Sequence, residues 1–175
     1  MTTELNKTVT LNLIGTIRTP HTTVNGIPVQ PVGSSDEGIV ELFPEFAEGL
    51  MDVDGFSHVM LLFHLHKMKK EYKLTITPFM DLKEHGVFAT RSPSRPAAIG
   101  LSTVKVKKVE GSKLYFEGAD MLDGSPLIDI KPFFRNVDNR PDAISGWLEN
   151  KEENIASKHR SDDRFMERKA IHKMN

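Results

Sequence analysis

Short apolar runs separated by glycine and proline turns recur along most of this chain, and they constrain its fold more than any other feature. Little of the chain has apolar residues every three to four positions, the spacing of a long amphipathic helix. A short helical turn is expected over 44–55. Many short strands with tight turns are typical of an antiparallel barrel or sandwich. The expected strands cover residues 9–18, 38–43, 56–67, 73–80, 101–111, 113–120 and 127–134.

The segment 56–67, FSHVMLLFHLHK, is the clearest of these strands. Because successive side chains of a strand point to opposite faces, its residues divide into two sets. One set is entirely apolar and predicts a core face: Val59, Leu61, Phe63 and Leu65. The other includes His64 and His66, which together with Asp81 could bind a metal ion, although packing or hydrogen bonding is the favoured role for a strand histidine.

Composition excludes several classes of protein. The 175 residues include 23 Lys plus Arg and 24 Asp plus Glu, a formal net charge of -1, which argues against a generally basic nucleic-acid binder. There is no cysteine, so disulfides and cysteine zinc sites are excluded. The Rossmann and P-loop glycine patterns are absent. No secretory signal or membrane-spanning run is evident, so a cytoplasmic protein that does not enter the membrane is expected.

The segment 86–100, GVFATRSPSRPAAIG, combines two arginines with two prolines between expected strands. Arg91 and Arg95 offer planar guanidinium groups that suit a carboxylate or a phosphate. The prolines restrict the backbone and reduce the entropy lost on binding. The sequence leaves two interpretations open: a rigid site for an anionic or polar ligand, and a surface connection whose arginines pair with nearby carboxylates.

Two other polar segments allow a structural and a functional interpretation. In DMLDGSPLIDIKP, residues 120–132, the acidic residues surround an Asp-Gly pair that suits a tight turn, but their carboxylates could also hold ligand hydroxyls or amines. Four lysines at and after the end of the strand expected over 56–67 form either a solvated turn or a patch that attracts an anionic partner such as RNA. These lysines are Lys67, Lys69, Lys70 and Lys73.

From residue 139 onward charged residues dominate, and apolar residues are sparse except around Trp147. We therefore divide the chain into a β-domain over 9–140 and a charged, helical extension over 141–175. Within the extension we expect a helix docked on the barrel near 141–150, followed by a solvated helix or a fraying tail.

Three motifs in order, GFSHVMLLFHLH, GVFATRSPSRPAAIGLS and DMLDGSPLIDIKPF, closely resemble the TrmO (TsaA-like, YaeB) family. The resemblance extends from IGTIRTP at residue 14 to residue 134. It implies an all-β fold, a small antiparallel β-barrel that binds S-adenosylmethionine. It also implies a homodimer with the cofactor near the subunit interface, and N6-methylation of N6-threonylcarbamoyladenosine in tRNA.

The resemblance also implies a set of cofactor-binding positions, carried over where this sequence matches the family motifs. They are Pro28, Val29, Gln30, His66, Lys67, Arg91, Leu101, Asp120, Asp123, Gly124 and Ser125. His66 and Asp123 are the candidates for a catalytic base, and Arg95, Lys69 and Lys70 are the candidates for substrate binding. No metal is implied.

The chain departs from the family pattern where RPAAIG replaces the usual RPNPIG, so that Ala97 and Ala98 stand for Asn and Pro. Loss of an amide side chain removes several hydrogen-bonding functions and bears on the substrate. Val29 also stands where a basic residue is common. Two alternatives to a tRNA methyltransferase therefore stay open: an S-adenosylmethionine-dependent methyltransferase for a small molecule, and a non-catalytic S-adenosylmethionine-binding module.

Overall fold

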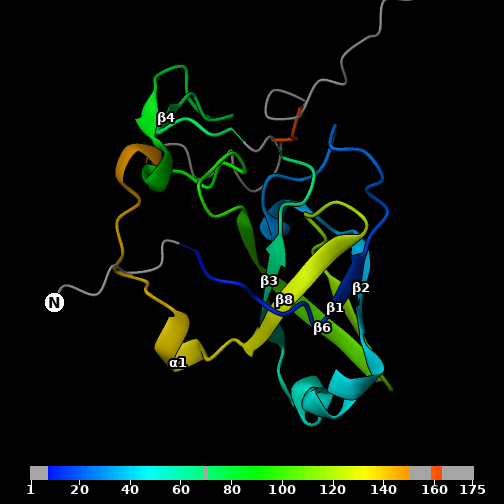
Figure 1. Ribbon diagram of the computed structural model, residues 1–175. Helices are drawn as coiled ribbons and strands as arrows, with labels where there is room; N and C mark the ends of the chain where they lie inside the picture. Colours follow the sequence, from blue (N-terminus) through cyan, green and yellow to red (C-terminus); the bar gives the residue numbers. More distant parts are fainter. Residues whose placement is uncertain (1–7, 69–70, 150–158, 163–175) are drawn as a thin grey trace, which may run out of the picture.

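Six strands close into an antiparallel β-barrel in the computed structural model, which describes residues 8–68, 71–149 and 159–162. Around the barrel the neighbours follow the order β1–β2–β7–β6–β3–β8, and β8 pairs with β1 to close it (Figure 1). The predicted all-β class and barrel are confirmed. The strands are β1 (Gly15–Arg18), β2 (Glu37–Leu42), β3 (His58–His64), β6 (Ile99–Glu110), β7 (Lys113–Glu117) and β8 (Ser125–Pro132).

The alternation of apolar and polar side chains along β3 decides which of its faces is buried. Val59, Leu61 and Phe63 are at most 3% exposed and lie in the barrel core, whereas Leu65, beyond the end of the strand, is only partly buried. Strand β3 pairs with β6 on one side and with β8 on the other, so both of its edges are satisfied by backbone hydrogen bonds.

Two glycines within strands make room for aromatic rings of the core. A Cβ atom on Gly100 of β6 would lie 2.4 Å from Cε2 of Phe63, and one on Gly38 of β2 would lie 2.3 Å from Cζ of Phe116. Since real Cβ atoms do not approach so closely, glycine leaves the space that each ring occupies next to the neighbouring strand.

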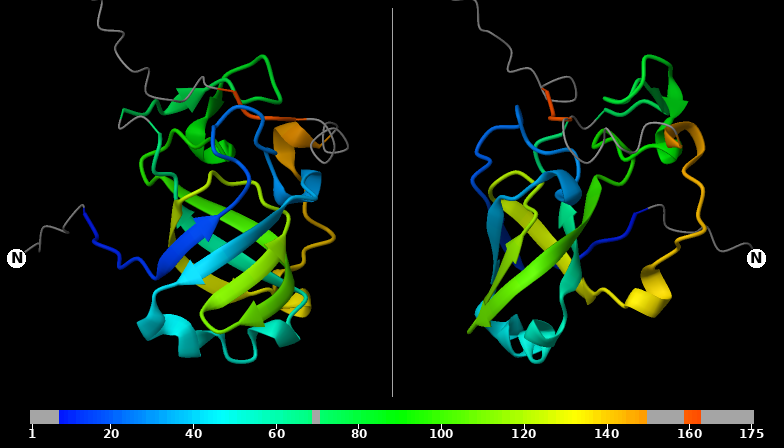
Figure 2. Two further views of the ribbon diagram at one scale, coloured as in Figure 1. Left: turned by 90° about the vertical axis from the view of Figure 1, so that its right-hand side faces the viewer. Right: turned by 180° about the vertical axis from the view of Figure 1, so that it is seen from behind.

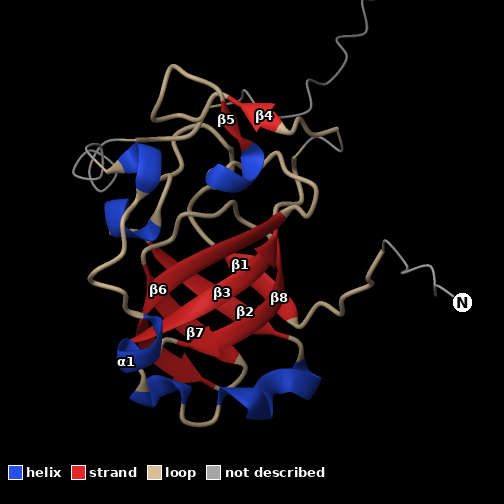
Figure 3. Cartoon of the chain, turned by 90° about the vertical axis from the view of Figure 1, so that its left-hand side faces the viewer, coloured by secondary structure: helices blue, strands red, loops and turns tan. Residues whose placement is uncertain are grey.

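Short helices and a two-stranded sheet cap the barrel. The turns η2 and η3 cover one end, while the small sheet of β4 and β5 stands beyond the other end (Figures 2 and 3). No helix of the described ranges is both long and apolar enough to cross a membrane. These elements are η1 (Pro31–Gly33), η2 (Pro44–Leu50), η3 (Val53–Gly55), β4 (Thr75–Ile76), β5 (His85–Gly86), η4 (Val87–Ala89), α1 (Arg135–Asp138) and η5 (Gly146–Leu148).

Three predicted elements differ from the structure. The strand expected over 9–18 begins only at Gly15, and the apolar residues before Ile14, such as Val9, are exposed. The strand expected over 73–80 is shortened to the two residues of β4, which pairs with β5 outside the barrel. The helix expected over 141–150 is reduced in 141–149 to η5, because Gly146 adopts a left-handed φ of 59° that breaks a regular helix.

Candidate functional site

A cavity of about 990 Å³ lies at the end of the barrel where β3 ends and β6 begins. Its wall combines the long loop after β1, the end of β3, the segment 78–97, the start of β6, the turn before β8 and residues of the C-terminal part. Most of the residues predicted to bind the cofactor or substrate therefore come together. Those that line the cavity are Pro28, Val29, Gln30, His66, Lys67, Arg91, Arg95, Leu101, Asp120 and Ser125.

Two of the predicted site residues that the structure describes do not line this wall. Asp123 and Gly124 lie in the turn beside it, as described below. Lys69 and Lys70 lie outside the described residues. Arg135 belongs to α1 at the opposite end of the barrel (Figure 3). Among the described residues, the lysine and arginine side chains that line the cavity are Lys67, Arg91 and Arg95.

The segment 86–100, here called the arginine loop, is held in place by one buried side chain and one side-chain hydrogen bond. Val87 of η4 is fully buried, and the Thr90 hydroxyl donates a hydrogen bond of 2.8 Å to the Val87 carbonyl. Arg91 then crosses to the long loop, where its Nη1 donates to Oε1 of Gln30 at 2.5 Å. Arg95 donates to the Thr90 carbonyl instead. Among the described residues, the side-chain hydrogen bonds of the two arginines go to an amide oxygen and a backbone carbonyl.

Asp120 is the most perturbed acidic group of the site. Its Oδ1 accepts a hydrogen bond of 2.7 Å from the hydroxyl of Ser102, and both residues line the cavity. The residue keeps part of its surface open to the cavity, but protein atoms surround the carboxyl group. This burial raises the pKa of Asp120 to about 7, against the smaller opposing effects of the Ser102 hydrogen bond and the Arg91 charge. The carboxyl group can therefore hold or release a proton near neutral pH.

Asp123, three residues later, has a different environment. Its Oδ1 accepts a hydrogen bond of 3.1 Å from the Thr19 amide, and its Oδ2 lies 4.0 Å from Nη1 of Arg18. The next residue, Gly124, has a φ of 75° and donates its amide to the Ile17 carbonyl. These contacts join the turn to β1 and the loop after it, which is the turn chemistry that an Asp-Gly pair favours.

His66 and Lys67 follow directly after β3. The His66 amide donates to the His64 carbonyl at 2.9 Å, which turns the chain toward the cavity. Burial, and then repulsion from Lys67, lowers the pKa of His66. This shift favours the neutral imidazole, which has one nitrogen free of a proton. Of the two candidate bases, His66 is the one that the cavity reaches.

The other histidines that the structure describes do not gather around a metal site. Asp81 lies 3.1 Å from Nε2 of His85 rather than beside His64 and His66, and the His85 ring stacks on Trp147 with centroids 4.2 Å apart. Within 8–68, 71–149 and 159–162, no three acidic or histidine side chains are placed to hold a metal ion.

Sequence reasoning missed several residues of the cavity. Phe88 stands inside the arginine motif, is 74% exposed and lines the cavity, and the pattern of that motif could have identified it. Trp147 and Ser161 reach the wall from the charged extension, where no local pattern indicated a site. Ala97, one of the two departures from the family motif, also lies in the wall, while the carbonyl of Ala98 accepts the Leu65 amide.

Residues 16–139 match the family described as the tRNA-methyltransferase O N-terminal domain. The chain belongs to the TrmO family. The family predicted from the three motifs is thereby confirmed, and with it, at the level of the family, an S-adenosylmethionine-dependent methyltransferase.

Relatives and solved structures agree with this assignment. A probable S-adenosyl-L-methionine-binding protein of Pyrococcus abyssi is 44% identical over 153 residues, which are 87% of this chain and 82% of that protein. A tRNA (adenine(37)-N6)-methyltransferase of Mus musculus is 44% identical over 100 residues, or 56% of this chain and 23% of that protein. The crystal structure of TrmO from Pseudomonas aeruginosa superposes with a TM-score of 0.70 at 35% identity, covering 84% of this chain and 64% of that chain. This chain thus spans less than two thirds of the solved TrmO chains.

Proposed function

We propose that this protein binds S-adenosylmethionine in the cavity and methylates N6 of N6-threonylcarbamoyladenosine in tRNA. The observation that carries the proposal is the meeting of Arg91, Gln30 and Asp120, from three segments far apart in sequence, at one cavity. The family assignment and the names of the relatives support the cofactor and the reaction class.

The side chains present fit this cofactor. S-adenosylmethionine carries a carboxylate, an ammonium group, ribose hydroxyls and an adenine ring. The guanidinium of Arg91 suits the carboxylate, and the carboxyl group of Asp120 suits the ammonium group or a hydroxyl. Leu101, which is 49% exposed and lines the cavity, offers apolar surface to the adenine. Pro28 and Val29 add apolar wall on the side of the long loop.

When bound, the cofactor supplies an electrophilic methyl group on its sulfonium. The task of the protein is then to orient the acceptor and to accept a proton from it. His66 is a suitable acceptor at its unprotonated ring nitrogen, because its lowered pKa favours the neutral imidazole. Asp120 can hold a proton at its carboxyl group near neutral pH.

The size and rim of the cavity support a large acceptor. Its volume of about 990 Å³ lies at the top of the range of roughly 300–1,000 Å³ for small-molecule pockets, which leaves room for an acceptor beside a cofactor. Phe88 presents an exposed aromatic ring on which a nucleobase can stack. Arg95, which the sequence predicts for substrate binding, and the neighbouring Lys67 supply positive charge for a phosphate backbone.

The second candidate function is methylation of a small molecule. The observation that favours it is Ala97, which lines the cavity where the family usually has Asn and so changes the hydrogen bonds available to an acceptor.

The experiment that tests the two functions is a methyl-transfer assay with purified full-length protein. S-adenosylmethionine and tRNA that carries threonylcarbamoyladenosine are incubated with the protein, and the nucleosides are analysed by mass spectrometry. We expect methylation of the modified nucleoside and none in a tRNA that lacks the modification. An unchanged nucleoside profile in tRNA from cells without the protein would instead favour the small-molecule function.

We also propose a homodimer with the cofactor near the interface, working in the cytoplasm. The dimer is supported by exposed apolar side chains on the segment next to the cavity rim, since Leu74 and Leu82 are 64% and 96% exposed. Sedimentation of the purified protein tests the dimer: a monomer at micromolar concentration would contradict it.

A further inference from the structure

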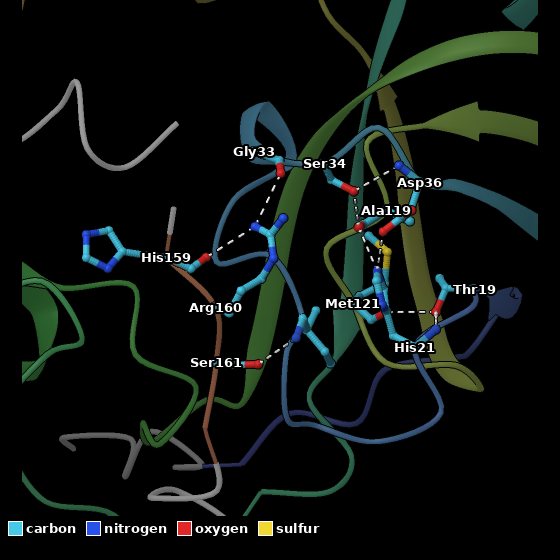
Figure 4. A network of polar contacts seen from close by, with 11 residues as sticks. Thr19, His21, Gly33, Ser34, Asp36, Ala119, Met121, His159, Arg160 and Ser161 are labelled. Atoms are coloured by element: carbon cyan, nitrogen blue, oxygen red, sulfur yellow. Dashed lines mark hydrogen bonds and ion pairs between the residues drawn. The ribbon is translucent and has the colours of Figure 1, made fainter. Parts of the chain in front are cut away.

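The C-terminal segment 159–162 lies beside the long loop after β1, although more than 120 residues separate them in sequence (Figure 4). Pro28 and Arg160 form an antiparallel bridge. The Val29 amide donates to the His159 carbonyl at 3.2 Å, and Nη1 of Arg160 lies 3.4 Å from the carbonyl of Gly33, to which it donates. This segment lies outside residues 16–139, the part that matches the family.

Ser161 makes four further hydrogen bonds to the same loop. Its amide donates to the Ile27 carbonyl at 2.9 Å, and its carbonyl accepts the Gly26 amide at 2.9 Å. Its hydroxyl accepts the Ile27 amide at 3.1 Å and donates to the Val24 carbonyl. One serine thus satisfies four backbone groups of the loop.

The loop depends on this segment for its backbone hydrogen bonds. Among the described residues, the backbone-to-backbone hydrogen bonds of 24–29 outside regular elements all join it to 159–161. The next turn, around η1, is closed locally by the Gly33 and Ser34 amides. The loop is therefore held in two ways: the Ile27 side chain is buried, and the Ile27 backbone is hydrogen-bonded to Ser161.

The residues fixed in this way are those that meet the arginine loop. Pro28, Val29 and Gln30 line the cavity, and Gln30 accepts the hydrogen bond from Arg91. Ser161 itself is part of the same wall. A loop held in its binding shape before the ligand arrives loses less conformational entropy on binding.

We propose that the segment 159–162 is a structural wall of the cofactor site, and that Ser161 is a positioning residue that holds the loop of Pro28, Val29 and Gln30 in its binding conformation. The inference rests on the proposed function, because it assumes that S-adenosylmethionine binds in this cavity. The position of the loop itself can be measured without any ligand.

The test uses the full chain with Ser161→Ala, which removes the hydroxyl, and Ser161→Thr, which keeps it. Ser57→Ala is the matched control, since the Ser57 hydroxyl contacts Nδ1 of His58 at the far end of β3 from the cavity. Calorimetry with S-adenosylmethionine is expected to show roughly 5- to 30-fold weaker binding for Ser161→Ala, from the loss of two hydrogen bonds. Ser161→Thr and Ser57→Ala are expected to stay within about twofold of the parent.

Hydrogen exchange of the ligand-free protein separates the two proposals. We expect the Ile27 amide to be protected in the parent and in Ser161→Thr, and to exchange faster in Ser161→Ala. If the parent protects Ile27 but binds no S-adenosylmethionine, the proposed function fails while the contact stands. If Ser161→Ala leaves exchange or affinity unchanged, or if Ser57→Ala weakens binding equally, the positioning role is overturned.

Discussion

The barrel and the loops around its cavity are held together by different forces. In the barrel, six paired strands enclose side chains such as Leu61 and Phe116 that have no exposed surface. At the cavity, irregular loops are joined by single polar contacts. The Thr19 hydroxyl donates to the Met121 carbonyl at 2.9 Å, and the Ser34 hydroxyl donates to the Ala119 carbonyl at 2.7 Å (Figure 4).

This difference predicts that mutations in the two regions have separate effects. Burial of apolar surface dominates the stability of a domain, whereas hydrogen-bonded loops can change with little effect on the core. Substitutions in the barrel should therefore lower the free energy of unfolding, and substitutions at the cavity should lower ligand affinity.

Phe116→Ala is expected to have the largest effect. Removal of a fully buried ring that lies against Gly38 should lower the free energy of unfolding by about 3–5 kcal/mol, measured by urea denaturation. Phe134→Ala, at a ring that is 48% exposed, should cost less than about 1 kcal/mol. Equal losses for the two variants would show that the barrel core does not dominate stability.

The pH dependence of stability should identify Asp120. Its pKa is raised in the folded protein to about 7 from 3.8, so the fold favours the protonated form. The associated stability is fully present below about pH 4 and is lost as the pH rises through 7, a change on the order of 2–4 kcal/mol. Denaturation at pH 4, 6 and 8 should show this loss in the parent and not in Asp120→Asn. An identical pH profile for the variant would rule out this role for Asp120.

Arg91→Ala should separate affinity from stability. We expect S-adenosylmethionine to bind about 10- to 100-fold more weakly by calorimetry, because a charge-assisted contact is lost. The free energy of unfolding should change by less than about 0.5 kcal/mol, since Arg91 is exposed. Arg140→Ala is the control, because the hydrogen bonds of Arg140 within the described part of the chain go to the nearby carbonyls of Val137 and Asn139. An unchanged affinity in Arg91→Ala would remove this residue from the site.

Asp123→Ala should have the smallest effect, and it distinguishes the turn from the site. Loss of the bond from the Thr19 amide should cost about 1 kcal/mol of stability. If Asp123 serves only the turn, the affinity for S-adenosylmethionine stays within about twofold. A drop comparable to that of Arg91→Ala would support the position implied by the family motif.

Asp120 and Asp123 show which part of the site the sequence could predict and which part it could not. The same motif predicts both Asp120 and Asp123 as cofactor ligands, and only Asp120 lines the cavity. The turn of the chain between them orients one side chain toward Ser102 and the other toward Thr19. No local pattern indicates this, because the partners lie 18 and 104 residues away.

The sequence by itself determined the all-β class, the buried face of β3 and the family, and the resemblance to that family implied the barrel. Each follows from local alternation or from motifs that are contiguous in the chain. Only the tertiary structure decided that β4 lies outside the barrel and that Ser161 joins the cavity wall. These outcomes depend on which distant backbone groups meet, and hydrogen bonds between segments more than 100 residues apart leave no period in the sequence.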